Sequence, residues 1–146
     1  MKIKLFNPKC MPVKADTGDW YDLCVAEDIW VKPNNGHHKA EVTMIPLGIA
    51  AELPEGKFAI IAPRSSTAKR HGIILAGSIG IIDNEYNGPN DQWMFPAISL
   101  LEQGSIIQEG TRIAQFHLFD VMPDLEFEVS SLEENENRGG FGSTGE

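Results

Sequence analysis

The chain contains the stretch GIIDNEYNG (residues 80–88), in which a short apolar run leads into a carboxylate, Asp83, an aromatic ring, Tyr86, and a glycine turn. Apolar residues followed by turn-forming residues are typical of a strand that enters a tight hairpin. Such a hairpin holds Asp83 at its mouth and Tyr86 on its floor. The carboxylate can take a proton from water, and the aromatic face can seat a flat ring. An ordinary Asp-Asn turn beside a strand tyrosine explains the same residues, so the stretch needs support from the rest of the chain.

Outward from this stretch, short β-forming runs alternate with turn residues. Gly, Pro or Asn interrupts the sequence about every 8–12 residues, a spacing typical of an all-β sandwich or barrel. One short helix is expected at residues 66–70, because longer periodic segments are missing. The runs expected to form strands are 2–6, 21–25, 29–31, 41–46, 48–52, 57–63, 73–75, 79–82, 94–100, 105–107, 112–119 and 125–129.

Length and composition narrow the possible functions. A chain of 146 residues is long enough for one domain with a sizeable core. Its 12 Lys and Arg against 21 Asp and Glu give a net charge of -9, which argues against binding to a nucleic-acid backbone but not to a single nucleotide. Without an apolar run near about 18 residues or a signal-peptide core, the sequence predicts a cytoplasmic protein with no membrane span. Cys10 and Cys24 are expected to be buried apolar residues rather than a disulfide or metal ligands.

The C-terminal stretch differs in composition from the rest of the chain. Residues 133–137 are mostly charged, and RGGFGSTG (138–145) is rich in glycine. A disordered tail is the usual fate of such an end. The segment nevertheless carries an arginine, an aromatic and two hydroxyls among glycines whose backbone amides can approach anionic oxygens closely. Two interpretations stay open, a solvated tail and a flap over a phosphate group.

Five segments occur in one order along the chain: DWYDL (19–23), PRSSTAK (63–69), GIIDNEYNG (80–88), GTRIAQ (110–115) and RGGFGSTG (138–145). Together they resemble the motifs of the trimeric dUTPases, over residues 19–145. The resemblance implies hydrolysis of dUTP to dUMP and pyrophosphate, which limits uracil incorporation into DNA and supplies dUMP for thymidylate synthesis. It also implies a jelly-roll-like β-barrel (1–132) that forms a homotrimer with active sites between subunits. A flexible C-terminal arm (133–146) from another chain would close each site.

The resemblance implies a role for each motif. Asp83 would deprotonate the water that attacks the α-phosphorus, and Gln115 and Ser65 would help to hold the water or the α-phosphate. Tyr86 would pack under the deoxyribose and exclude ribose. Mg²⁺ would be carried on the triphosphate and meet Asp22 only through water.

The remaining substrate contacts also follow from the resemblance. Main-chain groups of a hairpin at residues 75–82 would read uracil, and the N-terminal end of the short helix would meet phosphate. The tail would stack one aromatic ring on uracil and bring an arginine to the γ-phosphate. The residues in these roles are Arg64, Ser65, Ser66, Gly77, Ile82, Arg138, Phe141, Gly142, Ser143 and Thr144.

Several positions depart from the common family pattern. Asp19 and Trp20 replace the small pair that usually begins the first motif, and Ser66 stands where glycine is usual. Gly77 occupies the place where an asparagine often contacts uracil, and the tail motif is shorter than its commonest form. One close backbone approach to phosphate and one base contact are therefore not assigned.

Two other functions compete with the hydrolase. A dCTP deaminase shares the barrel and a similar hairpin, but the tail RGGFGSTG favours the hydrolase. A regulatory binding protein could use the same nucleotide site as a switch for an unidentified protein partner. Release of ammonia from dCTP, or nucleotide-dependent capture of a partner, would separate these functions from dUTP hydrolysis.

Overall fold

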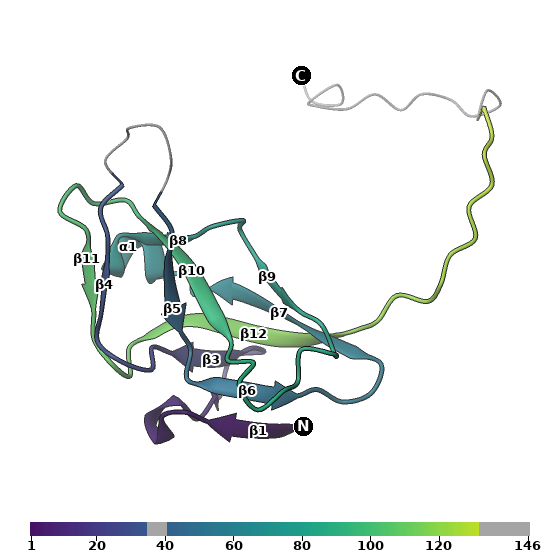
Figure 1. Cartoon of the computed structure of the whole chain (residues 1–146), viewed down its shortest axis with the longest axis horizontal. Coiled ribbons are helices and arrows are strands. Elements are labelled where there is room, and N and C mark those ends of the chain that lie inside the picture. Colours follow the sequence, from purple (N-terminus) through teal and green to yellow (C-terminus); the bar gives the residue numbers. More distant parts are fainter. Residues whose placement is uncertain (35–40, 132–146) are drawn as a thin grey trace.

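The computed structural model describes residues 1–34 and 41–131, and its regular structure is almost entirely β (Figure 1). The elements follow in the order β1 (Lys2–Leu5), η1 (Pro8–Cys10), β2 (Val13–Lys14), β3 (Tyr21–Cys24), β4 (Ile29–Val31), β5 (Thr43–Pro46), β6 (Ile49–Glu52), β7 (Lys57–Pro63), α1 (Thr67–His71), β8 (Ile73–Leu75), β9 (Gly80–Ile82), β10 (Met94–Ser99), β11 (Ser105–Ile107) and β12 (Arg112–Asp120). No helix among these residues is both long and apolar enough to cross a membrane.

Antiparallel pairing brings the motif segments together. Over the described residues, one five-stranded sheet has the order β2-β3-β12-β7-β9, and a three-stranded sheet has the order β5-β10-β8. Two further pairs are β1-β6 and β11-β4. Within the large sheet, Gln115 of β12 lies opposite Asp22 of β3 and Ala62 of β7. Three motifs that are distant in sequence therefore become neighbours.

The core lies between the sheets and follows the alternation of their strands. Strand β10 buries Phe95, Ala97 and Ser99, while the residues between them are partly exposed, which is the period-2 pattern of a half-buried strand. Just before it, the fully buried Trp93 packs edge-to-face on Phe116 of β12, with ring centroids 5.2 Å apart. Each such side chain stabilises the fold by roughly 1.5–3 kcal/mol. The prediction of an all-β fold with one core is confirmed.

Helix α1 is short and is fixed on the start of β12. Arg64 N–H and the hydroxyl of the buried Thr67 both donate to the carbonyl of Ile113, at 3.1 and 2.6 Å. The helix ends at Gly72, whose left-handed φ of 61° lets its N–H bond back to the Ala68 carbonyl. The expected helix at 66–70 is therefore confirmed within one residue at each end.

Two secondary-structure expectations are wrong. Residues 121–131 form no strand, because no strand of the described chain lies beside them, and they leave the body as an extended segment (Figure 1). Residues 75–82 do not form a hairpin, because β8 pairs with β10 whereas β9 pairs with β7. The short strand β2 was not expected, since two residues carry no periodic signal.

The expected separation of the two cysteines is also wrong. Cys10 and Cys24 form a disulfide, with their Cα atoms 5.4 Å apart. The turn η1 folds back over the end of β3, so a tertiary contact joins residues that have no paired spacing in the sequence. The expectation that both cysteines are buried is confirmed, since neither is more than 5% exposed.

Candidate active site

Asp22 is the centre of a charge cluster to which three of the motifs contribute. Its side chain, on β3, is only 8% exposed. Arg64 Nε lies 2.8 Å from Asp22 Oδ1, and Arg112 Nη1 lies 3.2 Å from Oδ2. Arg64 also donates from Nη1 to the Arg112 carbonyl at 3.4 Å. We call Asp22, Arg64 and Arg112 the arginine cluster; because charge-assisted bonds are directional, it fixes the Arg64 guanidinium at the rim of the sheet.

Gln115 and the two serines border the arginine cluster. Gln115 Nε2 donates to the Pro63 carbonyl at 3.2 Å, which holds its amide beside the loop that enters α1. Ser65 is exposed, and Ser66 stands at the N-cap position without a side-chain capping bond. Helix capping therefore does not explain these hydroxyls. Hydroxyls, amide and guanidinium together suit the oxygens of a phosphate chain.

His71, at the end of α1, responds to the positive charge of this region. Burial first, and then the charges of Arg70 and Arg64, lower the pKa of His71 below 6.5. A neutral imidazole is therefore favoured next to the arginines. The folded chain therefore loses stability as the pH falls and this imidazole must take up a proton.

Asp83 lies on an anchored turn after β9. Tyr86 N–H donates to the Asp83 carbonyl at 3.1 Å, which closes the turn. Asn84 Nδ2 donates to the carbonyls of Pro54 and Lys57, at 2.9 and 3.1 Å, and ties the turn to the start of β7. The Asp83 side chain is exposed while the preceding Ile82 is buried. A carboxylate in this position is accessible to water and has a fixed backbone.

A cavity of about 310 Å³ adjoins this turn. The Tyr86 hydroxyl donates to the Gln92 carbonyl at 3.2 Å, which holds the ring at the cavity wall. The other walls are mostly apolar side chains of β5, β7, β9 and β10. The lining residues are Met44, Ile61, Gly80, Ile81, Ile82, Asp83, Tyr86, Gln92 and Met94. A flat, mostly apolar ring system can therefore bind beside the carboxylate.

The segment between β8 and β9 has an open backbone. Gly77 and Ser78 both have positive φ angles, 84° and 72°. A Cβ built at Gly77 would meet nothing within 4 Å, so the space beside this residue is free for a ligand. The left-handed conformation, rather than crowding, explains glycine here.

A single chain does not bring the arginine cluster and Asp83 together. On β7, Ala59 lies opposite Ile82, so Asp83 continues toward the start of the strand, whereas Arg64 follows its end. The six residue-to-residue steps from the level of Phe58 to Arg64 span about 20 Å at roughly 3.3 Å per step. That separation is far longer than the hydrogen-bond distances a catalytic step requires.

Some predicted site residues lie outside the described chain, and some residues of the cavity were not predicted. Arg138, Phe141, Gly142, Ser143 and Thr144 lie outside the described residues. Among residues that the sequence did not single out, Gln92, Met44 and Met94 line the cavity beside Tyr86. No motif marks these residues. The pairing of β5 with β10, in which Met94 lies opposite Pro46, places the two methionines, and Gln92 lies just before β10.

The residues present fit a metal that arrives with its ligand better than a resident one. In the described part of the chain, no group of three or more His, Cys, Asp or Glu side chains is suited to hold a cation. Both carboxylate oxygens of Asp22 face guanidinium groups. Asp22 is therefore not expected to ligate a cation directly, and its contact with a metal through water stays a prediction.

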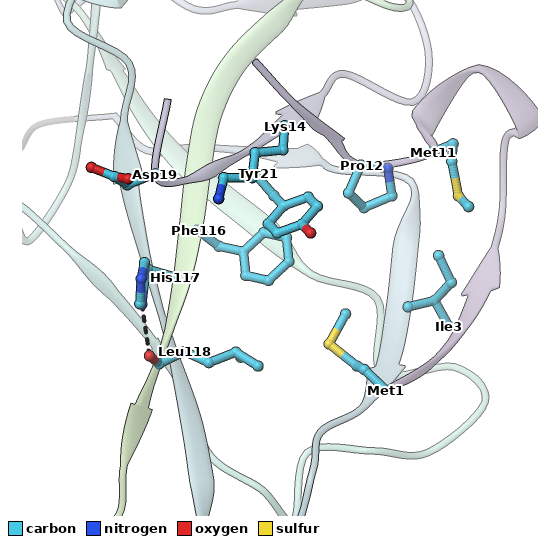
Figure 2. A pocket seen from close by; sticks show the side chains of 10 residues that line it. All are labelled: Met1, Ile3, Met11, Pro12, Lys14, Asp19, Tyr21, Phe116, His117 and Leu118. Carbon is cyan, nitrogen blue, oxygen red and sulfur yellow. Dashed lines mark hydrogen bonds between the residues drawn. The ribbon is translucent and has the colours of Figure 1, made fainter. Parts of the chain in front are cut away.

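A larger cavity, of about 550 Å³, lies away from Asp83 between the N-terminal segment and the large sheet (Figure 2). The rings of Tyr21 and Phe116 stack in it with centroids 5.6 Å apart, and Met1, Ile3 and Met11 lie on the opposite wall. Its mostly apolar lining offers few groups for phosphate. This cavity is therefore not the candidate active site.

Comparison with known proteins gives close relatives for the whole chain. The family model described as dUTPase matches residues 9–145. An SPbeta prophage-derived deoxyuridine 5'-triphosphate nucleotidohydrolase of Bacillus subtilis is 47% identical over 133 residues, covering 90% of this chain and 87% of the relative. The deoxyuridine 5'-triphosphate nucleotidohydrolase of Finegoldia magna is 34% identical over 152 residues, covering 99% of each chain.

Solved structures share the fold. A dUTPase from Streptococcus mutans matches with a TM-score of 0.75 at 22% identity, over 86% of this chain and 100% of that chain. A mutant of the dUTPase of Staphylococcus bacteriophage 80alpha, with dUpNHpp, matches with a TM-score of 0.72 at 19% identity, over 90% of this chain and 97% of that chain. At these identities the likeness concerns the fold, and it confirms the predicted jelly-roll-like barrel.

Proposed function

Because this chain belongs to the dUTPase family, it hydrolyses dUTP to dUMP and pyrophosphate, and we propose that Asp83 is the base of this reaction. The observation that carries the proposal is the exposed Asp83 carboxylate at a cavity walled by the Tyr86 ring. The anchored turn keeps the carboxylate where a bound nucleotide would present its phosphates. General-base catalysis contributes typically about 10²–10⁴-fold to a rate.

The chemistry needs one attacking water and stabilisation of charge on the phosphate oxygens. The Asp83 carboxylate takes a proton from the water while the water oxygen forms a bond to the α-phosphorus. The bond from the α-phosphorus to the bridging oxygen breaks, and pyrophosphate leaves with the electron pair. Arg64, Ser65 and Ser66 donate to the phosphate chain, and Gln115 helps to orient the water or the α-phosphate.

Selection of the nucleoside falls to the cavity. The Tyr86 ring, held by its bond to Gln92, packs under the sugar and leaves no room for a ribose 2'-hydroxyl. Main-chain groups of residues 75–82, including Gly77 and Ile82, read the uracil edge. The open backbone at Gly77 supports this assignment.

The dUTPase family is metal-dependent, and we assign Mg²⁺ as the ion. When bound, Mg²⁺ would neutralise charge on the triphosphate, which is its usual manner of binding to nucleotides. Asp22 would meet it through water and would also orient Arg64. Both functions are compatible with a carboxylate that is already paired with two guanidinium groups.

The active site is assigned between subunits of a homotrimer. The separation of Asp83 from Arg64 along β7 supports this, because one chain cannot apply both to one phosphate. Leu125, Phe127 and Val129 are 55%, 87% and 101% exposed, an alternating apolar pattern that a neighbouring subunit would cover. The apolar cavity beside β1 offers one surface for such a contact. The arm at 133–146, with Arg138 and Phe141, would close over dUTP from another chain.

The competing functions gain no support from the comparisons. Every relative described above is named a dUTP hydrolase, and none is a deaminase or a binding protein without enzymatic function. A cytoplasmic location is assigned as the compartment of dUTP, in keeping with the acidic composition.

The test is pyrophosphate release from dUTP, dCTP, dTTP and UTP with Mg²⁺, for the wild type and Asp83→Asn. Turnover of dUTP alone, falling about 10²–10⁴-fold in the variant while dUTP still binds, is expected. Glu85→Gln is the matched control, since it removes an exposed carboxylate from the same turn. Retained turnover in Asp83→Asn would refute the assigned base.

A further inference from the structure

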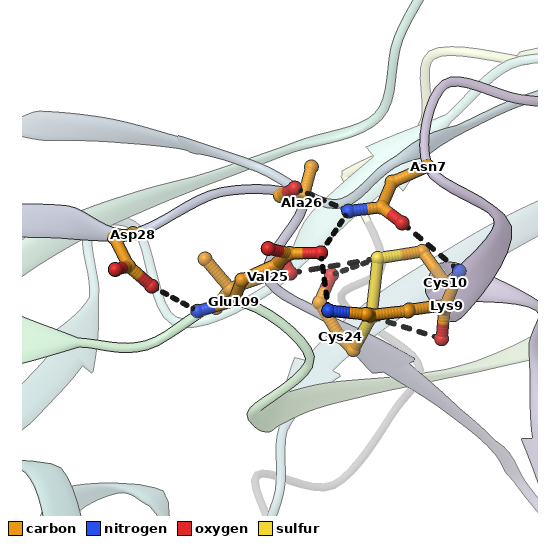
Figure 3. The surroundings of a disulfide bond; sticks show 8 residues. All are labelled: Asn7, Lys9, Cys10, Cys24, Val25, Ala26, Asp28 and Glu109. Atoms are coloured by element: carbon orange, nitrogen blue, oxygen red, sulfur yellow. Dashed lines mark hydrogen bonds and ion pairs between the residues drawn. A yellow bond between two sulfur atoms is a disulfide. The ribbon is translucent and has the colours of Figure 1, made fainter.

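The disulfide between Cys10 and Cys24 joins the N-terminal segment to the end of strand β3 (Figure 3). Cys10 is the last residue of η1, and Cys24 is the last residue of β3. Both side chains are buried, with 1% and 5% of their surface exposed. The bond therefore fastens one end of the N-terminal segment onto the large sheet.

The surroundings suit two thiols as well as a disulfide. Cys10 Sγ lies 3.5 Å from the Val25 carbonyl oxygen and 3.6 Å from that of Cys24 itself. Cys24 Sγ lies 3.6 Å from the Lys9 carbonyl oxygen. After reduction, each S–H would thus have an acceptor in place. Neither oxidation state leaves a buried donor without a partner, so both states are compatible with this packing.

Polar contacts hold the turn over the sulfurs. The Asn7 side chain accepts from Lys9 N–H at 2.9 Å and donates to the Ala26 carbonyl and to Glu109, both at 2.7 Å. Lys9 pairs with Glu109 at 3.0 Å, and the bonds from Asn7 and Lys9 lower the pKa of that carboxyl. These contacts hold the turn against the body beside the disulfide, and the disulfide adds a covalent link to them.

Gly48 leaves the space that the cystine occupies. A Cβ at this glycine would lie 2.5 Å from Cys10 Cβ and 2.7 Å from its Sγ. The backbone at Gly48, directly before β6, therefore approaches Cys10 so closely that only glycine fits at this position.

Strand β3 connects this pair to the arginine cluster. Cys24 lies opposite Arg112 in the ladder between β3 and β12, and Asp22 is two positions before it on the same strand. A looser end of β3 would therefore disturb the carboxylate that orients Arg64. In a reducing compartment, disulfides are more often redox-responsive than permanent.

We propose that Cys10 and Cys24 form a reversible redox clamp, which in its oxidised state fastens residues 1–12 to β3 and steadies the arginine cluster. The oxidant is a low-molecular-weight disulfide such as oxidised glutathione. One cysteine thiolate attacks it, forms a mixed disulfide and releases one small thiol. The second cysteine then attacks the mixed disulfide and releases the other small thiol, so two protons leave the protein and two electrons reduce the oxidant.

The experiment compares the full chain equilibrated with oxidised or reduced glutathione, then unfolded in acid and alkylated. Mass spectrometry should find no alkylated cysteine in the oxidised sample and two in the reduced one. The Tm should fall by about 6–12 °C on reduction, the scale for opening a loop of this size in a domain of this length. The variant with Cys10→Ser and Cys24→Ser should show no redox-dependent change in Tm.

A kinetic comparison tests the coupling to the active site, which rests on the proposed role of Arg64. Reduction should raise the KM for dUTP several-fold in the wild type while kcat stays within about twofold, and should leave the double variant unchanged. Two alkylated cysteines after oxidation would overturn the disulfide, and an equal Tm in both states would overturn the clamp. A lower Tm with an unchanged KM would overturn the coupling. Thiol count and Tm need no turnover, so an inactive enzyme would count only against the proposed function.

Discussion

Asp22 shows how one buried carboxylate can prepare a site without touching the reacting atoms. Its two oxygens separate Arg64 from Arg112 and give each guanidinium a fixed partner. Hydrogen bonds to charged groups contribute about 1.5–3 kcal/mol each, more than a surface ion pair. We therefore assign Asp22 as a positioning residue for Arg64.

Asp22→Asn should raise the KM for dUTP about tenfold, with a smaller change in kcat, because Arg64 loses its charged partner. The measurement is steady-state pyrophosphate release over a range of dUTP and Mg²⁺ concentrations. Glu52→Gln, which breaks the exposed pair with Lys2, should leave KM unchanged. A change confined to the Mg²⁺ requirement would instead assign Asp22 to the metal.

The sequence predicted candidate residues for the site but not which of them make contact. Asp22, Arg64 and Gln115 were recognisable from their motifs, yet their contacts depend on the register between β3, β12 and β7. No local pattern encodes that register. The disulfide between Cys10 and Cys24 could not be predicted for the same reason, because the tertiary position of the N-terminal segment brings the two sulfurs together.

At the level of elements, glycine positions show where the backbone leaves no freedom. Gly104 and Gly110 have nearly equal φ angles, 77° and 78°. A Cβ at Gly104 would lie 2.6 Å from the Val31 carbonyl oxygen, whereas one at Gly110 would meet nothing within 4 Å. Glycine is therefore required at position 104 by both crowding and backbone conformation, and at position 110 by backbone conformation alone.

Gly104→Ala should lower the free energy of unfolding by about 3 kcal/mol, because β11 must move away from β4 in addition to bearing the left-handed strain. Gly110→Ala should cost about 1 kcal/mol, from the conformational strain alone. Urea denaturation at fixed protein concentration measures both. Equal losses in the two variants would show that the contact with Val31 is relieved at no cost.

Helix α1 makes part of the stability depend on pH through His71. Its pKa is below 6.5 in the folded chain, so the unfolded chain binds a proton more readily as the pH falls. The stability linked to this group is therefore complete above pH 6.5 and is lost as the pH drops from 6.5 toward the folded pKa. His71→Gln should show a smaller fall in Tm between pH 7.5 and 5.5 than the wild type. Parallel curves for the two proteins over this range would contradict the assignment.

Strand positions were predictable where a strand has its partner within the chain. The runs ending at Pro63 and beginning at Arg112 were expected within one residue of β7 and β12, because alternation and turn residues mark them. The run at 125–129 has the same alternation but no partner strand in the described chain. The predicted hairpin at residues 75–82 is wrong for a different reason. A turn that connects two sheets contains the same residue types as a hairpin turn, so the sequence does not distinguish them.

At the scale of the whole molecule, the geometry of β7 governs how a complete site can arise. Asp83 follows β9 beside the start of this strand, and Arg64 follows its end, so each chain would supply half of two different sites. A cyclic trimer provides such pairing by symmetry, because every chain then meets a neighbour in the same way. Two inactive chains could therefore complete each other.

Co-expressed Asp83→Asn and Arg64→Ala chains should together recover about a quarter of the wild-type kcat per site, although each variant alone is inactive. A complete site needs Asp83 from one chain and Arg64 from its neighbour, and a random equal mixture supplies that combination in about one site of four. Wild type mixed equally with the double variant is the control. Sites shared between chains predict about a quarter in both mixtures, whereas sites within one chain predict none in the first and about half in the second. Pyrophosphate release from the unfractionated mixtures decides between these outcomes, and a recovery of zero in the first mixture would return both residues to a single chain.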